Sequence, residues 1–213
     1  MTRFLGRRNA FLSVGAIALV GLALLAGGPA SARSPRGLVA TMVSSTGTAA
    51  GTVRIVPQDD GKVLVRASGM GLAAGFHGFH VHTTGICDPA AKDTAGTTVP
   101  FFSAGGHYNP VSTNTHGAHA GDMPPLLAAT DGTAVLRFKS DRFLVRDLMD
   151  EDGSAIIMHA GPDNLAHIPA TTATGGERYH SHVDSALGPD AATKATGDAG
   201  ARFACGVLTR VNS

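Results

Sequence analysis

Histidines are concentrated in short stretches of the chain that could bind metal. The stretch "HGFHVH" spans residues 77 to 82 and places His80 and His82 two positions apart. In an extended strand alternate side chains share a face, so both imidazoles would point the same way and could chelate one ion. His77 has the other parity, and we expect it to brace a loop through hydrogen bonds.

A second stretch, "GGHYNPVSTNTHGAHAGD", holds three imidazoles and one carboxylate within 16 residues: His107, His116, His119 and Asp122. Such a set can fill the four positions of a tetrahedral Zn²⁺ site. A third stretch, "SAIIMHAGPD", reads as a strand that ends at His159. Each of these histidines taken alone is also compatible with a structural role.

The count of candidate ligands restricts the chemistry. The three stretches offer seven groups, whereas two four-coordinate ions need about eight bonds. Either one site keeps an open position or one imidazole serves both ions, and both arrangements indicate chemistry rather than scaffolding. A site dominated by imidazoles suits copper, while a mixed histidine and aspartate site suits zinc.

The elements that must position these groups read as β-strands. Short runs rich in valine, isoleucine and threonine alternate with polar positions, and Asp-Gly turn signals separate several of them. We predict eight strands, at residues 38–43, 52–56, 62–67, 79–82, 134–139, 143–148, 155–159 and 203–211. Because no segment has a helical stripe, the pattern predicts an all-β sandwich or barrel.

Two long loops interrupt the strand pattern, at residues 83–125 and 160–201. Loops of this length are uncommon in a compact domain unless they are functional or pinned. The first contains the second histidine stretch and Cys87, and the second contains Asp163. We therefore expect both loops to belong to the functional site.

Residues 1–32 have the pattern of a secretory signal peptide. Basic residues come first, an apolar run follows, and Ala30-Ser31-Ala32 forms a small-x-small cleavage signal. We expect an exported chain whose mature part, residues 33–213, is one domain. The Arg7-Arg8 pair leaves a twin-arginine export route open beside the general one.

The composition of the mature part excludes several classes of function. Its 14 basic and 16 acidic residues give a net charge of −2, and nothing indicates nucleic-acid binding. No apolar stretch after the signal approaches the ~18 residues that span a membrane. Two cysteines in an exported chain, Cys87 and Cys205, are expected to form one disulfide.

These stretches together resemble the copper,zinc superoxide dismutases in the form that bacteria export. The matching segments are "HGFHVH" with Cys87 after it, "SAGGHYNP", "HAGDMP", "IIMHAGPDN" and "GDAGARFACGVL". They occur in the order of the family and run through most of the mature chain. The resemblance implies an eight-stranded Greek-key β-barrel, an immunoglobulin-like sandwich, that dismutes superoxide to dioxygen and hydrogen peroxide.

The resemblance also implies a role for each site residue. Copper would be bound by His80, His82, His107 and His159, and zinc by His107, His116, His119 and Asp122. His107 would bridge the two ions and pass a proton to the substrate. Asp163 would hydrogen-bond a ligand of each metal, Arg202 would guide the anionic substrate, and Lys194 is a weaker candidate for that task. Cys87 and Cys205 would form the disulfide of the family.

The chain departs from the family pattern in its two loops. His116 and His119 stand only three positions apart, which requires a tighter turn between the zinc ligands and leaves a copper-only dismutase as an alternative. The second loop is longer than in many relatives and repeats the His-x-His spacing at His180 and His182. We expect this pair to be solvated, with an accessory metal contact as the alternative. His167 has no assigned partner.

Two further questions stay open at the level of sequence. A non-enzymatic exported copper carrier on the same fold would also need the histidines, although not Arg202 or Asp163. A homodimer is possible, and the exported product is expected either in the periplasm or cell envelope or outside the cell.

Overall fold

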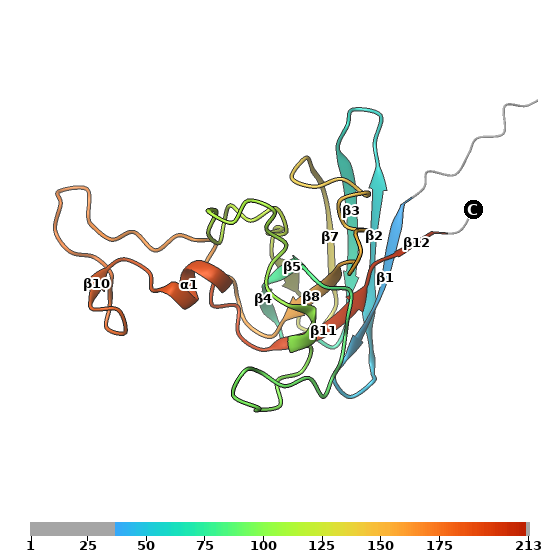
Figure 1. The fold of residues 1–213 in the computed structure, drawn as a ribbon, viewed down its shortest axis with the longest axis horizontal. Coiled ribbons are helices and arrows are strands. Elements are labelled where there is room, and N and C mark those ends of the chain that lie inside the picture. Colours follow the sequence, from blue (N-terminus) through green and yellow to red (C-terminus); the bar gives the residue numbers. More distant parts are fainter. Residues whose placement is uncertain (1–36, 212–213) are drawn as a thin grey trace, which may run out of the picture. The chain divides into compact units, whose positions relative to one another are not determined.

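The computed structural model describes residues 37–211, so the expected signal peptide lies outside the described part. That part is almost entirely antiparallel β-structure (Figure 1). Its strands are β1 Leu38–Ser44, β2 Ala49–Pro57, β3 Val63–Gly69, β4 Gly75–His77, β5 Phe79–His82, β6 Leu126–Ala128, β7 Ala134–Ser140, β8 Ala155–His159, β9 His180–Ser181, β10 Ala186–Leu187, β11 Arg202–Val207 and β12 Thr209–Arg210. A 3₁₀ turn, Phe102–Ala104, and one short helix, α1 Ala191–Thr196, complete the elements.

The main sheet closes on itself as a barrel. Its hydrogen-bonded order is β4-β6-β7-β3-β2-β1-β11-β8-β5, with β12 paired to β1. The strands at the two ends of this order, β4 and β5, are separated along the chain by Gly78 alone. Neighbours that are distant in sequence, such as β3 with β7 and β1 with β11, give the Greek-key connections. The expected eight-stranded barrel is confirmed when β4 with β5, and β11 with β12, are each taken as one strand.

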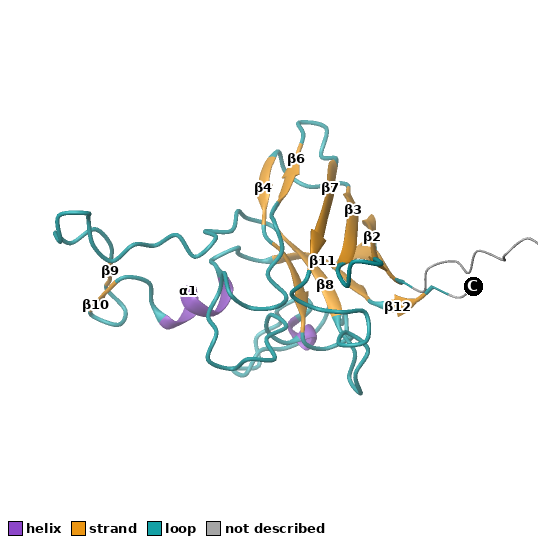
Figure 2. Cartoon of the chain, turned by 90° about the horizontal axis from the view of Figure 1, so that it is seen from above, coloured by secondary structure: helices purple, strands orange, loops and turns teal. Residues whose placement is uncertain are grey.

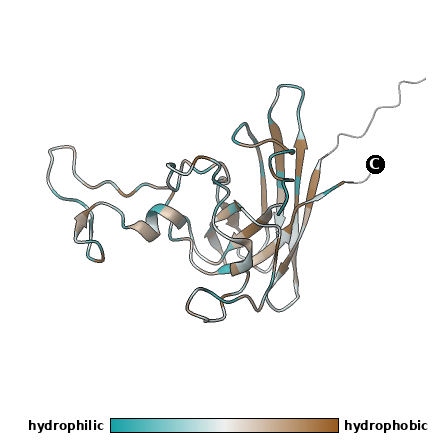
Figure 3. Ribbon diagram, viewed as in Figure 1, coloured by the Kyte–Doolittle hydropathy of each residue, from teal (hydrophilic) through white to brown (hydrophobic). Residues whose placement is uncertain are grey.

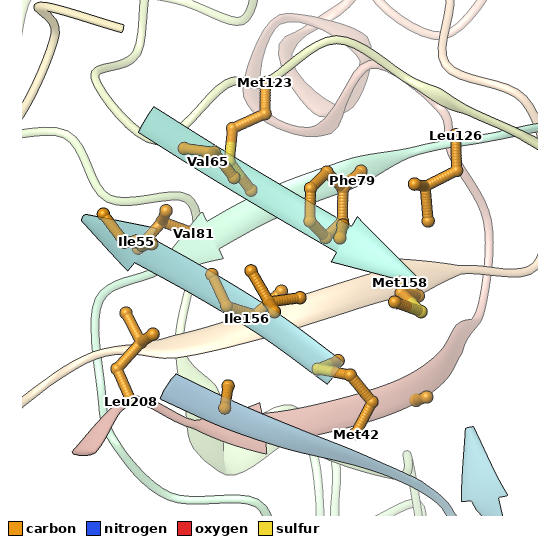
Figure 4. Close-up of a cluster of buried hydrophobic side chains, with 14 of the residues drawn as sticks. Met42, Ile55, Val65, Phe79, Val81, Met123, Leu126, Ile156, Met158 and Leu208 are labelled. Carbon is orange, nitrogen blue, oxygen red and sulfur yellow. The ribbon is translucent and has the colours of Figure 1, made fainter. Parts of the chain in front are cut away.

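The interior of the barrel holds the main hydrophobic core. Alternate residues of β5, Phe79 and Val81, pack into it against Ile156 and Met158 of β8 (Figure 4). Apolar residues are concentrated in the barrel strands, whereas the long loops contain both apolar and polar residues (Figure 3). Because side chains alternate along a strand, the neighbours of Phe79 and Val81 face outward from this core. This is how β5 presents His80 and His82 to the loops.

One predicted strand is wrong, and several short strands, β6 among them, were not predicted. Residues 143–148 form a turn, in which the Leu144 backbone N–H donates to the Asp147 carboxylate at 2.8 Å. Phe143 and Leu148 are buried, so the apolar residues of this segment fill the core from a turn rather than from the sheet. The strand between the first loop and β7 is β6, whose three residues are too few for a visible alternation.

The two long loops lie where the sequence places them, between β5 and β6 and between β8 and β11 (Figure 2). The second contains the β9–β10 hairpin and α1, which the sequence pattern did not predict. The disulfide between Cys87 and Cys205 is confirmed, with Cα atoms 5.7 Å apart. It belongs to a small second core with Phe101, Ala104, Ala155 and Ile157. Within residues 37–211, no helix has the length and apolar character to cross a bilayer.

Candidate metal centre

The first loop folds back onto β5 and carries its ligands with it. The backbone N–H of Tyr108 donates to the Val81 carbonyl at 2.8 Å, and Val81 N–H donates to the Gly121 carbonyl at 2.9 Å. A side chain at position 121 would collide with the Val81 carbonyl, so this approach requires glycine. The contacts place His107 opposite His82, and Asp122 opposite His80.

The end of β8 supplies the third segment of the site. The His159 backbone N–H donates to the Gly78 carbonyl at 2.8 Å, which fixes the end of β8 beside the start of β5. The ring of His159 lies 4.9 Å from that of His80, and the ring of His107 stacks on His80 at 3.9 Å. The seven predicted ligands therefore come together from three separate segments of the chain.

Four buried imidazoles each leave one nitrogen without a hydrogen-bond partner among the described residues. One is His116 Nδ1, near Asp122, and the other three are His80 Nδ1, His82 Nε2 and His159 Nε2. In each of these last three rings the other nitrogen is engaged. His80 Nε2 lies 2.6 Å from the Asp163 carboxylate, His82 Nδ1 lies 2.9 Å from the Gly105 carbonyl, and His159 Nδ1 lies 3.0 Å from the Gly200 carbonyl. An acceptor on one side places the ring proton there and leaves a lone pair on the free nitrogen.

The same three rings are uncharged near neutral pH. Burial lowers the pKa of His80 to about 4, against the raising effect of Asp163. Burial and the nearby His80 ring lower the pKa of His159 to about 3, and burial and Arg202 hold the pKa of His82 well below its usual range. Buried lone pairs on neutral imidazoles would be costly without a partner, and they fit a metal ion.

A second set of donors gathers around the carboxylate of Asp122. Asp122 Oδ1 lies 3.4 Å from Nδ1 of both His116 and His119, and 2.8 Å from His107 Nδ1. His119 Nδ1 and His107 Nδ1 are 3.5 Å apart. Ligands at about 2.0 Å from one tetrahedral ion lie about 3.3 Å from each other, close to most of these distances. The short turn between His116 and His119 therefore does not separate the two rings.

Two groups of four donors each lie close enough to share an ion. One consists of His80, His82, His107 and His159, and the other of His80, His107, His116 and Asp122. His107 and His80 occur in both groups, but Asp163 already occupies one nitrogen of His80. His107 is consequently the ring best placed to serve two ions at once.

Asp163 connects the two sides of the centre. Its Oδ2 accepts from His80 Nε2 at 2.6 Å, and its Oδ1 accepts from His116 Nε2 at 2.7 Å. The side chain is 2% exposed. Burial raises the pKa of Asp163, but the hydrogen bonds with His116 and His80 outweigh burial and hold it well below its usual range.

The charge on the second side is concentrated at His116. Burial lowers the pKa of His116, but the carboxylates of Asp122 and Asp163 raise it to about 9. Burial raises the pKa of Asp122, yet its contacts with His107 and His116 hold it well below its usual range. Without metal, the proton on His116 supplies a positive charge between the two carboxylates, where a bound cation would otherwise supply it.

An open cavity of about 460 Å³ leads to the first group of donors. Its lining includes His82, His107, His159 and Arg202, together with several residues near the end of the second loop: Ala195, Thr196, Asp198, Ala199 and Gly200. Burial lowers the pKa of Arg202, but an arginine guanidinium keeps its charge in proteins. The cavity thus combines a fixed positive charge with the site of the neutral imidazoles, which suits a small anion.

Backbone carbonyls hold Arg202 in place. Its guanidinium donates to the carbonyl of Phe101 and, at 2.6 Å, to that of Gly105. The Gly105 carbonyl also contacts His82 Nδ1, so one oxygen links the arginine to the donor group. These carbonyls could not be identified from sequence, because every residue carries one.

Three other residues near the centre are His77, Lys194 and Asp198. His77 braces the end of β8, as expected, with its ring nitrogens 2.9 Å from the His159 carbonyl and 2.8 Å from the Ala73 carbonyl. Lys194 is not in the lining of the cavity, and its backbone carbonyl accepts from His116 N–H. Asp198, which the sequence did not single out, lies in the lining with its carboxylate bound to Asn164 and Thr193.

The sequence model of the copper/zinc superoxide dismutase family matches residues 49–208, which make up most of the chain. The chain belongs to this family. A relative from Mycobacterium tuberculosis, a Cu-Zn superoxide dismutase, is 40% identical over 174 residues, which cover 80% of this chain and 69% of the relative. A second, from Photobacterium leiognathi, is 34% identical over 169 residues, 76% of this chain and 80% of the relative.

Solved structures of the copper/zinc superoxide dismutase family have the same fold. The Cu/Zn superoxide dismutase from Brucella abortus aligns with a TM-score of 0.57 and 28% identity over 81% of this chain and 99% of its own. Copper and zinc are thus the metals of the family, and the two adjacent donor groups of this chain fit two ions.

Proposed function

We propose that this chain dismutes superoxide, converting two superoxide anions and two protons into dioxygen and hydrogen peroxide. The observation that carries the proposal is the cavity that joins the Arg202 guanidinium to His82, His107 and His159. Relatives at 34% and 40% identity that are named Cu-Zn superoxide dismutases support the same reaction. A copper carrier needs the imidazoles but has no use for a half-buried arginine that lines the same cavity.

We assign copper to His80, His82, His107 and His159, and zinc to His107, His116, His119 and Asp122. The free nitrogens of the first set, and the short distances from Asp122 to the histidines of the second, support this division. His80 is left out of the zinc set because its one free nitrogen faces the copper donors and Asp163 takes the other.

Copper, when bound, supplies one-electron redox chemistry, which zinc lacks. The side chains of the protein bind the substrate, donate a proton and orient the ligand rings. Arg202 attracts and orients the superoxide anion, since its charge is held in the cavity by two carbonyls. A ring nitrogen of His107, which lines the same cavity, holds and donates a proton that the peroxide product requires. Asp163 keeps the His80 and His116 rings in a fixed orientation.

The test is a dismutation assay on protein reconstituted with both metals, with free copper at the same concentration as the reference. We expect a rate far above that of free copper and about one copper and one zinc per chain. A rate no better than free copper would favour the carrier instead. Full activity with copper but no bound zinc would overturn the zinc assignment and favour a copper-only dismutase.

We propose further that the chain is exported, that residues 1–32 are removed as a signal peptide, and that residues 33–213 act as one domain in the envelope or outside the cell. The disulfide supports export, because such bonds persist in oxidising compartments. The mass of the protein recovered from envelope and culture fractions tests the proposal. Unprocessed chain confined to the cytoplasm would contradict it.

We also propose that two copies associate through an exposed apolar row on the outer face of the barrel. Phe76 of β4 pairs with Leu127 of β6, Val135 of β7 lies on the neighbouring strand, and all three side chains are exposed. Sedimentation analysis should show a dimer that Leu127→Ser weakens. Val183→Ser changes an equally apolar exposed residue outside this row and serves as the matched control. A wild-type monomer at micromolar concentration would refute the association.

A further inference from the structure

The second loop carries a pair of histidines that the metal centre does not use. His180 lies on β9 and His182 begins the turn that follows, with Ser181 between them. Ser181 is buried whereas both histidines are exposed, so the two rings stand on the solvent side. Their centroids are 5.4 Å apart and their planes are tilted by 56°. Neither ring forms a hydrogen bond with any residue in the range 37–211 that the structure describes.

The spacing of this pair matches that of the buried donors. The rings assigned to copper are 3.9 to 6.3 Å apart in pairs, with 6.3 Å for His80 and His82, which share the His-x-His spacing. The value for His180 and His182 falls within this range. With metal–nitrogen bonds of about 2.0 Å, two imidazoles on one ion have centroids about 4.5 to 6 Å apart. The exposed rings are thus already at chelating distance.

Backbone contacts hold the segment that presents the two rings. His180 pairs with Leu187, and Ser181 pairs with Ala186, in the β9–β10 hairpin. The Asp184 backbone N–H donates to the Ser181 hydroxyl at 3.0 Å, which fixes the turn around His182. An ion that binds here would therefore pay little to order the backbone.

We propose that His180 and His182 form a second, surface metal site that takes one Cu(II) ion per chain, with water in the remaining positions. Imidazole ligands suit several divalent ions, and Cu(II) stands highest in their affinity order. The site is separate from the dismutase centre, because the hairpin is not in the lining of the cavity that leads there, and β10 stands away from the barrel strands in both views (Figures 1 and 2). The inference does not depend on the proposed dismutation.

The experiment uses the full protein with its buried sites loaded and excess metal removed. Cu(II) is then titrated at pH 7.5 and followed by calorimetry and by electron paramagnetic resonance. We expect one additional Cu(II) per chain, with a signal that shows nitrogen ligands and differs from that of the buried ion. Zn(II) and Ni(II) should bind the same site at least about tenfold more weakly.

Variants of the two histidines test whether they bind the additional Cu(II). His180→Ala combined with His182→Ala should abolish the additional binding, and each single change should weaken it at least about tenfold. The matched control is His167→Ala, which removes an exposed histidine of the same loop that has no second histidine in contact and should leave the binding unchanged. The resonance of the buried copper reports that every variant is folded. Additional binding that survives the double change, that is equally lost in the control, or that is absent from the wild type would overturn the proposal.

Discussion

The carboxylate of Asp163 contacts His80 Nε2 at 2.6 Å, across 83 residues of chain. Because its other oxygen contacts His116, this one side chain orients a ring on each side of the centre. The two groups of donors are consequently linked through Asp163 as well as through His107, which belongs to both.

Replacing Asp163 by asparagine should weaken zinc binding by about 10- to 100-fold. The amide has one oxygen in place of two, so it cannot accept from both rings, and it loses the negative charge that stabilises His116. Chelator competition measures the zinc dissociation constant. Asp59→Asn, which changes an exposed carboxylate on the β2–β3 turn, is the control and should have no effect. Equal zinc affinity in both variants would show that Asp163 does not position the ligands.

The Arg202→Ala variant should lose about tenfold in the rate of dismutation, and the remaining rate should depend less on salt. The cause is loss of the positive charge in the cavity, since the variant keeps all the donor atoms. Copper content, measured by elemental analysis, should not change. Arg202→Lys should recover part of the salt dependence because it restores the charge without the same fit to the Phe101 and Gly105 carbonyls. A salt profile identical to that of the wild type in the alanine variant would remove the steering role.

Zinc binding to the metal-free protein should release about one proton at pH 7.5. The pKa of His116 is about 9 in the folded chain, so this ring is protonated at that pH and must lose its proton to bind an ion. Above pH ~10 the ring is already neutral and the release should vanish. On the copper side, His80 and His159 have pKa values of about 4 and 3, and above pH ~5 they should release none. Calorimetry in buffers of different ionisation enthalpy counts the protons, and a release that does not vary from pH 7.5 to 10 would contradict the assignment.

Removing the disulfide through Cys87→Ser with Cys205→Ser should lower the free energy of unfolding of the metal-free protein by up to roughly 4 to 5 kcal/mol. The bond closes a loop of 118 residues, and this figure is what chain entropy gives for such a loop. Arg202 should also lose its place, because the cluster around the bond holds the segment that includes Phe101 and leads to Gly105. Urea unfolding and the salt dependence of the dismutation rate check the two effects separately. Unchanged stability would mean that the first loop is held by its other contacts.

Residue types and spacing were sufficient to predict which histidines and carboxylates the fold brings together, because a His-x-His strand and a cluster of three histidines with an aspartate are rare and chemically specific. Seven of the eight predicted strands are present, and the shortest of them is the four-residue β5. The prediction was wrong at 143–148, where the Asp147 carboxylate stabilises a turn and the buried Phe143 and Leu148 mimic a strand pattern.

Other features could be identified only from the folded structure. The helix α1 is capped by Asp190 at its start and by Gly197 at its end. The six residues between these caps have no apolar stripe, so the hydrophobic pattern of the sequence did not indicate a helix. The carbonyls that hold Arg202, and the approach of Gly121 to Val81, are tertiary contacts of the backbone and leave no trace in residue types.

The continuity of β4 and β5 through Gly78 has a consequence for the behaviour of the protein at high concentration. A sheet whose first and last strands are two parts of the same strand presents almost no row of free amide and carbonyl groups on which another molecule could extend the sheet. The barrel strands therefore offer few edges at which two copies could join through backbone hydrogen bonds.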